Sequence, residues 1–315
     1  MSPVPVWRTW TALGLVYVVW GSTYLAIRYL VETLPPLLSA SARFLTAAAL
    51  LSAYVLVRRR PVRVPSARQA AAAAGIGLLL LLGGNGGVTL AESAHLPSGL
   101  AALLVAGVPL WVVVLRALAR DRPSPTTVAG VALGLVGLAV LLLPGARPQG
   151  VATWAVLLVL LSSVLWAVGS YLASRLDLPA DPLQTTVLQM VGGGAGLAVA
   201  GLVRGESLDV DRVSGVSVVA WAYLVVFGSL VAFTAYSWLL GTAPVSWVAT
   251  YAYVNPVVAV LLGVVVAGEA VTVTTLVGGA VTVLAVAVVV AEEGRRRRAQ
   301  PLEVPADAPV AQRDG

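Results

Sequence analysis

The chain of 315 residues contains no cysteine and a single histidine, His95. The absence of cysteine excludes disulfide bonds, zinc–thiolate sites, iron–sulfur clusters and cysteine nucleophiles. One histidine leaves little room for a metal site built from imidazole ligands. We therefore expect neither a metal nor a cofactor.

Charged residues are also scarce. They make up 11% of the chain, whereas soluble domains contain about 25%. Hydrophobic residues make up 59%, and the mean hydropathy is +0.92. A soluble protein of this size could not bury so much apolar surface in one core. The expected partner of that surface is the lipid bilayer.

Lysine is absent as well, so all 20 basic residues are arginine and the formal net charge is +6. In a soluble protein such a surplus would suggest nucleic acid. Here most arginines border long apolar runs, so membrane topology explains them better and no nucleic-acid partner is expected.

Long apolar runs predict an all-α membrane protein with ten transmembrane helices, since about 20 apolar residues cross the hydrocarbon core. The runs are continuous rather than alternating, which disfavours the strands of an outer-membrane barrel. The predicted spans are Thr9–Leu30, Leu37–Val57, Gln69–Ala91, Ser98–Leu118, Thr126–Leu143, Val151–Ala173, Leu183–Val203, Val216–Leu239, Val245–Ala267 and Thr272–Ala291.

The arginines also predict the orientation, because cytoplasmic segments carry an excess of basic residues. If the N-terminus is cytoplasmic, the inside segments contain fifteen arginines, and the outside loops contain only Arg147, Arg204 and Arg212. Both termini are therefore expected in the cytoplasm. The first apolar run has no A-x-A-like cleavage site before it and should remain as the first span.

An internal repeat emerges when the chain is shifted against itself by about 147 residues. Trp20 then falls near Trp166 and Tyr24 on Tyr171, while Pro97 and Pro109 fall on later prolines. The predicted domains are residues 1–146, with spans one to five, and 147–293, with spans six to ten. Residues 294–315 are expected to form a disordered cytoplasmic tail.

An odd number of spans in each half inverts the second half relative to the first. Inverted repeats are typical of transporters, whose substrate site lies between the halves near the middle of the bilayer.

Three stretches resemble EamA-type transporters of the drug/metabolite transporter superfamily. They are VWGSTYLAIRYLVETLPPLLSASARFLTAAALL (19–51), GNGGVTLAESAHLPSGLAALLVAGVPLWVV (84–113) and YAYVNPVVAVLLGVVVAGEAVT (251–272). The chain looks most similar to the YedA-like branch of bacterial exporters. The resemblance implies a ten-helix bundle in the bacterial plasma (inner) membrane, alternating access, and efflux of amino acids, metabolites or drugs. It leaves the individual small-molecule substrate open.

Aromatic residues near the middle of a span are candidates for a substrate-binding cavity. Trp and Tyr usually prefer membrane interfaces, and a central tyrosine needs a hydrogen-bond partner. The candidates in the first span are Trp20, Thr23 and Tyr24, and those in the sixth are Trp166 and Tyr171. Cavity walls and simple helix packing are both open explanations.

Arg43 lies about two turns inside the second span, and the related position in the second half holds Gln189; both are candidate substrate-binding residues. A guanidinium in lipid is costly and usually faces the bundle interior or water. Arg43 could bind a substrate carboxylate, satisfy carbonyls at a helix break, or reach the outer surface. Arg28 and Glu32 are spaced for an i,i+4 ion pair.

Asn85 lies among the glycines of GGNGG (83–87), which allow close helix approach. Its amide could bind substrate or another helix. In the ninth span, Asn255 precedes Pro256, and Pro109 lies in the fourth span. Proline bends or breaks a helix, and broken helices often mark transporter binding sites. Tyr251 completes the set of candidate substrate-binding residues. Packing kinks are the alternative.

Glycine pairs recur in the spans, and acidic residues are placed unevenly along them. The pairs Gly130–Gly134 and Gly192–Gly196 predict helix-packing faces. Acidic residues are missing near the middle of every predicted span, which argues against a central carboxylate relay and leaves only acids near span ends, such as Glu92.

The motifs of hydrolases, metalloproteases and P-loop proteins are also missing. We therefore expect a transporter rather than an enzyme. A passive channel or a membrane scaffold is the alternative.

Overall fold

The computed structural model describes residues 6–58, 64–120, 123–143, 150–242 and 250–299, and the regular elements within these ranges are all helical. Nine helices of this described part are long and apolar enough to cross a membrane. A tenth apolar helix, α13 (Tyr251–Ala267), is shorter. The start of the predicted ninth span, residues 245–249, lies outside the described residues.

Seven of the ten predicted spans correspond to single helices. Their bounds lie within a few residues of the prediction, apart from the start of the ninth span and the end of the tenth. They are α1 (Val6–Leu30), α2 (Pro36–Val57), α7 (Pro125–Leu142), α8 (Thr153–Ala173), α9 (Pro182–Val203), α13 and α14 (Val273–Ala299). Helix α14 continues beyond residue 293, where the predicted tail begins. Residues 300–315 of that tail are outside the described part.

Three spans are composite. The third consists of α3 (Ala67–Gly77), the π-helical segment η1 (Leu78–Gly86) and α4 (Gly87–Ser93). The fourth consists of α5 (Ser98–Val105) and α6 (Val108–Leu118). The eighth consists of α10 (Gly215–Tyr223), the π-helical segment η3 (Leu224–Val231) and α11 (Ala232–Thr242), and a short 3-10 helix, η2 (Val210–Arg212), precedes it.

Local sequence explains where many of these helices begin. Prolines occupy the first turn of α2, α7 and α9, where their missing N–H has no partner to lose. Ser66 and Gln69 form a capping box at the start of α3. The hydroxyl of Ser124 accepts a hydrogen bond from the N–H of Thr127 at the start of α7.

The two prolines predicted to break helices behave differently. The fourth span is divided between Val105 and Val108, directly before Pro109. The break expected at Pro256 does not occur, because α13 runs through this residue. Proline removes one backbone hydrogen bond near the start of the helix. Packing of α13 against α1 and α5 supports the helix around that gap.

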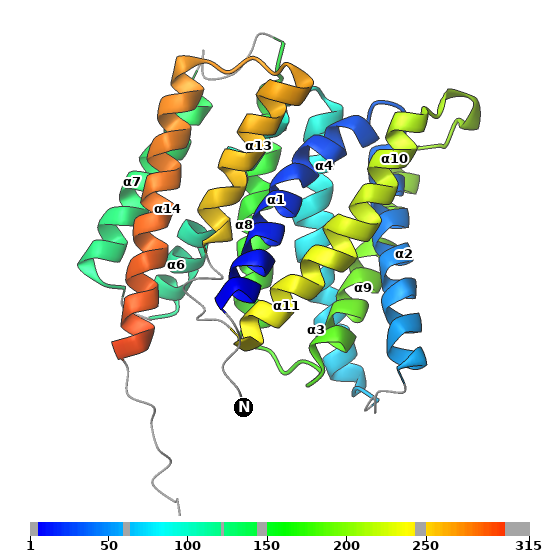
Figure 1. Cartoon of the computed structure of the whole chain (residues 1–315), viewed down its shortest axis with the longest axis horizontal. Coiled ribbons are helices and arrows are strands. Elements are labelled where there is room, and N and C mark those ends of the chain that lie inside the picture. Colours follow the sequence, from blue (N-terminus) through cyan, green and yellow to red (C-terminus); the bar gives the residue numbers. More distant parts are fainter. Residues whose placement is uncertain (1–5, 59–63, 121–122, 144–149, 243–249, 300–315) are drawn as a thin grey trace, which may run out of the picture.

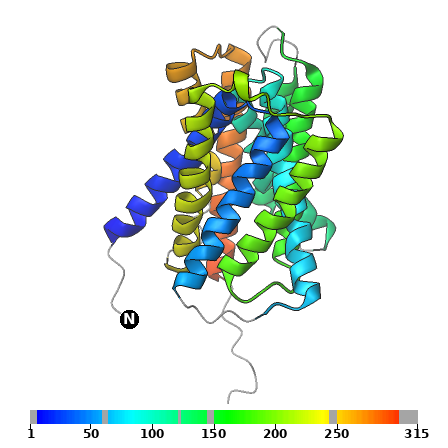
Figure 2. The same ribbon diagram turned by 90° about the vertical axis from the view of Figure 1, so that its right-hand side faces the viewer.

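The helices form one bundle in which α7 packs along α14 and α2 along α9, at opposite sides of Figure 1. Helix α1 crosses the other helices at an angle, as Figure 2 shows. The start of α1 and the end of α14 lie at the same end of the bundle (Figure 1), which we call the Glu293 end. The opposite end is called the Glu269 end.

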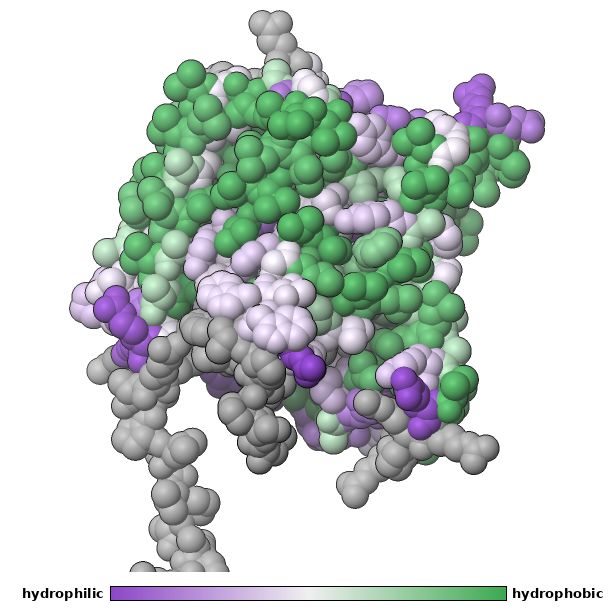
Figure 3. Space-filling view, viewed as in Figure 1, coloured by the Kyte–Doolittle hydropathy of each residue, from purple (hydrophilic) through white to green (hydrophobic). Residues whose placement is uncertain are grey.

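The outer surface and the helix contacts both suit a membrane. Apolar residues cover most of the face in Figure 3, and strongly hydrophilic residues gather at its upper and lower edges. The predicted glycine packing faces are confirmed. A Cβ atom at Gly192 would lie 2.6 Å from the Cα of Ala74, and one at Gly130 would lie 2.7 Å from Val289 Cγ2. Only glycine permits so close an approach.

Candidate functional site

The π-helical segments η1 and η3 were not predicted, and each holds a glycine followed by a polar residue. These pairs are Gly84–Asn85 in η1 and Gly228–Ser229 in η3. A π-helix closes its hydrogen bonds over five residues, and such segments often occur at functional sites. Side chains predicted to bind substrate lie against both segments.

Arg43 approaches η3 from α2. Its side chain is buried, with 5% of the residue exposed, as expected for a guanidinium that faces the bundle interior. Nε donates a hydrogen bond to Ser229 Oγ at 3.0 Å, and the guanidinium lies 4.7 Å from the centre of the Phe44 ring. Among the residues that the structure describes, Arg43 has no acidic partner.

Trp20 and Thr23 approach the same segment from α1. The indole Nε1 of Trp20 donates to the carbonyl oxygen of Gly228 at 3.3 Å. A Cβ at Gly228 would lie 3.2 Å from both Arg43 Nη2 and Thr23 Cγ2. Two helices of the first half therefore meet the second half at Gly228–Ser229. We call Trp20, Thr23, Arg43, Gly228 and Ser229 the η3 site.

An aromatic cluster borders the η3 site. The ring of Trp20 lies 5.1 Å from that of Tyr236 and 5.2 Å from that of Tyr251, in tilted and edge-on arrangements. Tyr251 therefore belongs beside the site. Tyr253, two residues later, packs against a different buried cluster. Tyr24 packs against that same cluster and lies within electrostatic range of Glu92.

Asn255 joins α13 to α1. In the orientation that satisfies its amide, the nitrogen donates to the carbonyl oxygens of Tyr17 and Tyr251, each at 3.3 Å. A Cβ at Gly21 would lie 3.1 Å from the Asn255 carbonyl oxygen. Asn255 thus holds two helices together next to the aromatic cluster, which is one of the two roles predicted for an amide inside a span.

The other predicted residues lie at or near η1. Trp166 of α8 packs over Gly84, where a Cβ would lie 2.6 Å from Trp166 Cε3. Asn85 Oδ1 is buried without a hydrogen-bond partner among the described residues. The backbone of Gln189 contacts Gly77 of α3, which ends directly before η1. Tyr171 is not part of this group, since its ring lies 5.1 Å from the guanidinium of exposed Arg175 at the end of α8.

The sequence did not predict one ion pair and two residues near the η3 site. Arg28 pairs with Glu269, 2.5 Å away, rather than with Glu32, because the loop before α14 brings Glu269 to the end of α1. Ser229 and Tyr236 were also missed. Gly228–Ser229 follows Gly84–Asn85 at nearly the offset of the Trp20 and Trp166 pair, so extending the repeat comparison could have found Ser229.

A bundle of apolar helices that collects polar and charged side chains in its interior is the architecture of a polytopic membrane transporter. The chain belongs to the EamA-like transporter family, whose model matches twice, at residues 9–143 and 153–291. This result confirms the resemblance seen in the sequence.

Known proteins give the same picture. The chain is 41% identical over 259 residues, 82% of each chain, to the "Uncharacterized inner membrane transporter YedA" of Escherichia coli K12. It is 25% identical to the "Probable amino-acid metabolite efflux pump" of Salmonella typhimurium, over 86% of this chain and 90% of the relative. A solved structure described as "Crystal structure of protein" shares the fold, with a TM-score of 0.58, 24% identity and coverage of 90% and 95%.

Proposed function

We propose that this protein is a secondary transporter that exports small organic solutes with a carboxylate group, such as amino acids or their metabolites, by alternating access. Arg43 is the observation that carries the proposal. A buried guanidinium is costly unless it is paired, and within the described part of the chain its Nε bonds a neutral hydroxyl, Ser229 Oγ, and no carboxylate. A substrate carboxylate would supply the missing negative charge, and the neighbouring aromatic rings would contact the rest of the solute.

The helix contacts support two inverted halves as the basis of alternating access. Span one (α1) packs on spans eight and nine, and span six (α8) packs on spans three and four. Spans two and seven pack together, as do spans five and ten. The family model also matches each half separately. In the proposed halves, residues 1–146 and 147–293, the η3 site lies between the two. Its position there is where a transporter of this kind binds substrate.

The proposed orientation places the Glu293 end and both termini in the cytoplasm. Thiol-reactive sulfonate reagents, which cannot cross the membrane, test this orientation. Because the chain contains no cysteine, a single cysteine introduced at exposed Val273 or exposed Val64 is the only target in each variant. In intact cells, Val273→Cys should react and Val64→Cys should not. The reverse result would invert the orientation.

Purified protein in liposomes tests the substrate class. A panel of amino acids, amines and drugs should reveal saturable flux with counterflow for carboxylate-bearing members. Arg43→Gln, which gives the second span the residue of its counterpart Gln189, should weaken that flux by roughly 10- to 100-fold, because a hydrogen bond to a charged group contributes about 1.5–3 kcal/mol. Arg43→Lys should lose less, since the charge remains.

Arg175→Gln is the matched control, because Arg175 is exposed at the end of α8 and should leave flux unchanged. Flux without saturation or counterflow would instead indicate the competing function, a passive channel. If Arg43→Gln transported carboxylates, as well as amines, at the same rate as the unmodified protein, the proposed role of Arg43 would be contradicted.

A further inference from the structure

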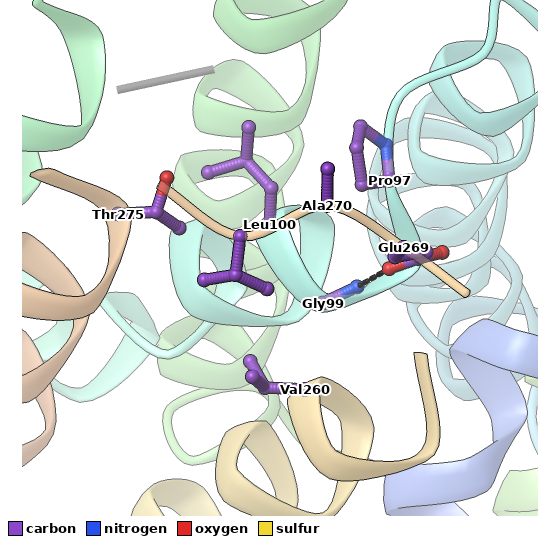
Figure 4. A pocket seen from close by; sticks show the side chains of 8 residues that line it. Pro97, Gly99, Leu100, Val260, Glu269, Ala270 and Thr275 are labelled. Atoms are coloured by element: carbon purple, nitrogen blue, oxygen red, sulfur yellow. Dashed lines mark hydrogen bonds between the residues drawn. The ribbon is translucent and has the colours of Figure 1, made fainter. Parts of the chain in front are cut away.

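The Glu269 end is held together by one acidic side chain. Glu269, in the loop between α13 and α14, accepts hydrogen bonds from Ser98 N–H and Oγ, each at 2.8 Å, and from Gly99 N–H at 3.0 Å. Figure 4 shows its carboxylate beside Gly99 at the start of α5. The same side chain pairs with Arg28 of α1 at 2.5 Å. We call these contacts the Glu269 clamp.

A second acid is buried close to the clamp. Glu92, in α4 at the end of the third span, is 3% exposed. Neither of its carboxyl oxygens has a hydrogen-bond partner in the part of the chain that the structure describes. An ionised carboxyl buried without a partner is strongly disfavoured, whereas a neutral acid is much less so. The surroundings of Glu92 therefore fit the protonated form.

The charged neighbours of Glu92 are the members of the clamp. Helices α1 and α5, which carry Arg28 and the Ser98–Gly99 end of the clamp, pack against α4. The charges of Arg28 and Glu269 therefore act on Glu92, and that of Glu92 acts on the phenol of Tyr24. Helix α5 and η1, which pack against α4, contain no ionisable side chain. Arg43 is the charged residue of α2, and it is directed at Ser229.

The other ionisable groups of the neighbouring elements have other contacts. Tyr54 of α2 lies against Arg58, and Tyr17 and Tyr29 of α1 pack against two separate clusters. Tyr171 is the ionisable residue of α8 and lies at the opposite end of that helix, near Arg175. His95, which follows Glu92 in the chain, is exposed. The guanidinium of Arg28 thus interacts electrostatically with the carboxyl groups of both Glu92 and Glu269, but it is bonded to Glu269 alone.

We propose that Glu92 is a proton-binding site that competes with Glu269 for Arg28 and so controls the opening of the Glu269 end. This inference rests on the proposed alternating access. When Glu92 carries a proton, Arg28 stays with Glu269 and the clamp is closed. When Glu92 releases the proton to water at this end, its negative charge attracts Arg28, whose side chain is 34% exposed and has room to move. Glu269 then loses its counterion and the clamp loosens.

Distances between spin labels across the Glu269 end test the proposal. Because the chain has no cysteine, labels can be attached to cysteines at two exposed positions, Glu32 after α1 and Val273 at the start of α14. His95→Asn in the same protein removes the only imidazole, and asparagine tolerates the positive φ of 63° at this position. The distance between the two labels is measured on the full chain in lipid nanodiscs, over a range of about pH 5 to 9.

In this labelled protein the ratio of long to short distances should rise with pH, by up to about tenfold per pH unit for one proton. Glu92→Gln mimics the protonated acid and should hold the short distance at every pH. Arg28→Gln removes the contested cation and should abolish the pH dependence while leaving Glu92 in place. Asp209→Asn, an exposed acid outside the clamp, is the matched control and should change nothing.

A pH dependence that survives in either Glu92→Gln or Arg28→Gln would overturn the proposal, as would a distance that does not change with pH in the labelled protein. The Arg28 variant keeps this test decisive if Glu92→Gln does not fold. Saturable flux in liposomes without any pH-dependent distance change would refute the role of Glu92 and leave the proposed transport intact. Pure channel-like flux would refute the transport mechanism instead.

Discussion

The segments η1 and η3 lie in the middle parts of the third and eighth spans. They are alike in how neighbouring helices pack on them and differ in their polar contacts. Each is π-helical, and each receives a tryptophan from another helix at a glycine, Trp166 at Gly84 and Trp20 at Gly228. The close approach of helices is therefore a property that both segments share. It depends on glycine, because a Cβ at either position would meet atoms of a neighbouring helix.

The polar groups differ between the two segments. At η3 the residue after the glycine, Ser229, accepts a hydrogen bond from Arg43. At η1 the corresponding residue, Asn85, has a buried oxygen without a partner among the described residues. The position related to Arg43 holds Gln189. The two segments thus share glycine–tryptophan packing, and the charged side chain among these contacts, Arg43, lies at η3. That asymmetry suits a site that binds an anionic group in one place.

The largest effect should come from filling the glycine contact in η1. In Gly84→Ala the new Cβ would lie 2.6 Å from Trp166 Cε3, and an indole ring wedged between helices cannot easily move. We expect a loss of about 1–3 kcal/mol in the free energy of unfolding, measured by thermal or denaturant unfolding in detergent.

Two further alanine variants make that test specific. In Gly228→Ala the nearest atoms, Arg43 Nη2 and Thr23 Cγ2, would lie 3.2 Å from the new Cβ, farther than Trp166 Cε3 in Gly84→Ala, so the cost in stability should be smaller. In Gly75→Ala nothing lies within 4 Å, and the variant should be neutral or stabilised by up to about 1 kcal/mol. Equal losses in Gly84→Ala and Gly228→Ala would contradict the difference in packing.

The hydropathy of the sequence predicts the framework well, because every span must be apolar over its whole length. It also makes an interior position one of the explanations for Arg43, since a charge facing lipid is costly. The π-helical segments could not be predicted in this way. A change from four- to five-residue hydrogen bonding leaves no mark on a run such as LLLLLGG, in which every position is compatible with both.

The contacts between distant residues were harder to foresee than the spans. The spacing of Arg28 and Glu32 favours a local ion pair. Arg28 instead pairs with Glu269, because the loop after α13 places Glu269 beside the end of α1. Tyr171 shows the limit of repeat matching. It is related to Tyr24 in sequence but lies at a helix end beside Arg175, whereas Tyr24 packs against a buried cluster.

The next effect in size concerns the hydroxyl at η3. Ser229→Ala removes the hydrogen-bond acceptor of Arg43 Nε and should cost about 1–2 kcal/mol in the free energy of unfolding, since bonds to a charged group exceed the average for bonds between membrane helices. Ser52→Ala is the control, because Ser52 bonds only within its own helix, to Ala48. Similar losses in the two variants would show that the Arg43 contact adds nothing to stability.

The smallest effect should come from the polar residue of η1. Asn85 Oδ1 is buried and unpartnered among the described residues, and it is therefore a desolvated group that contributes no bond to stability. Replacing it in Asn85→Ala removes that penalty together with some packing, so the free energy of unfolding should change by less than about 1 kcal/mol.

The same variant separates two roles for this amide. If Asn85 binds substrate, the Michaelis constant for carboxylate solutes should rise while stability is unchanged. If its oxygen bonds a neighbouring helix in another state of the transport cycle, the maximal flux should fall instead. A loss in unfolding free energy as large as that of Ser229→Ala would mean that η1 and η3 are equally bonded, and the one-sided chemistry inferred from the comparison would be wrong.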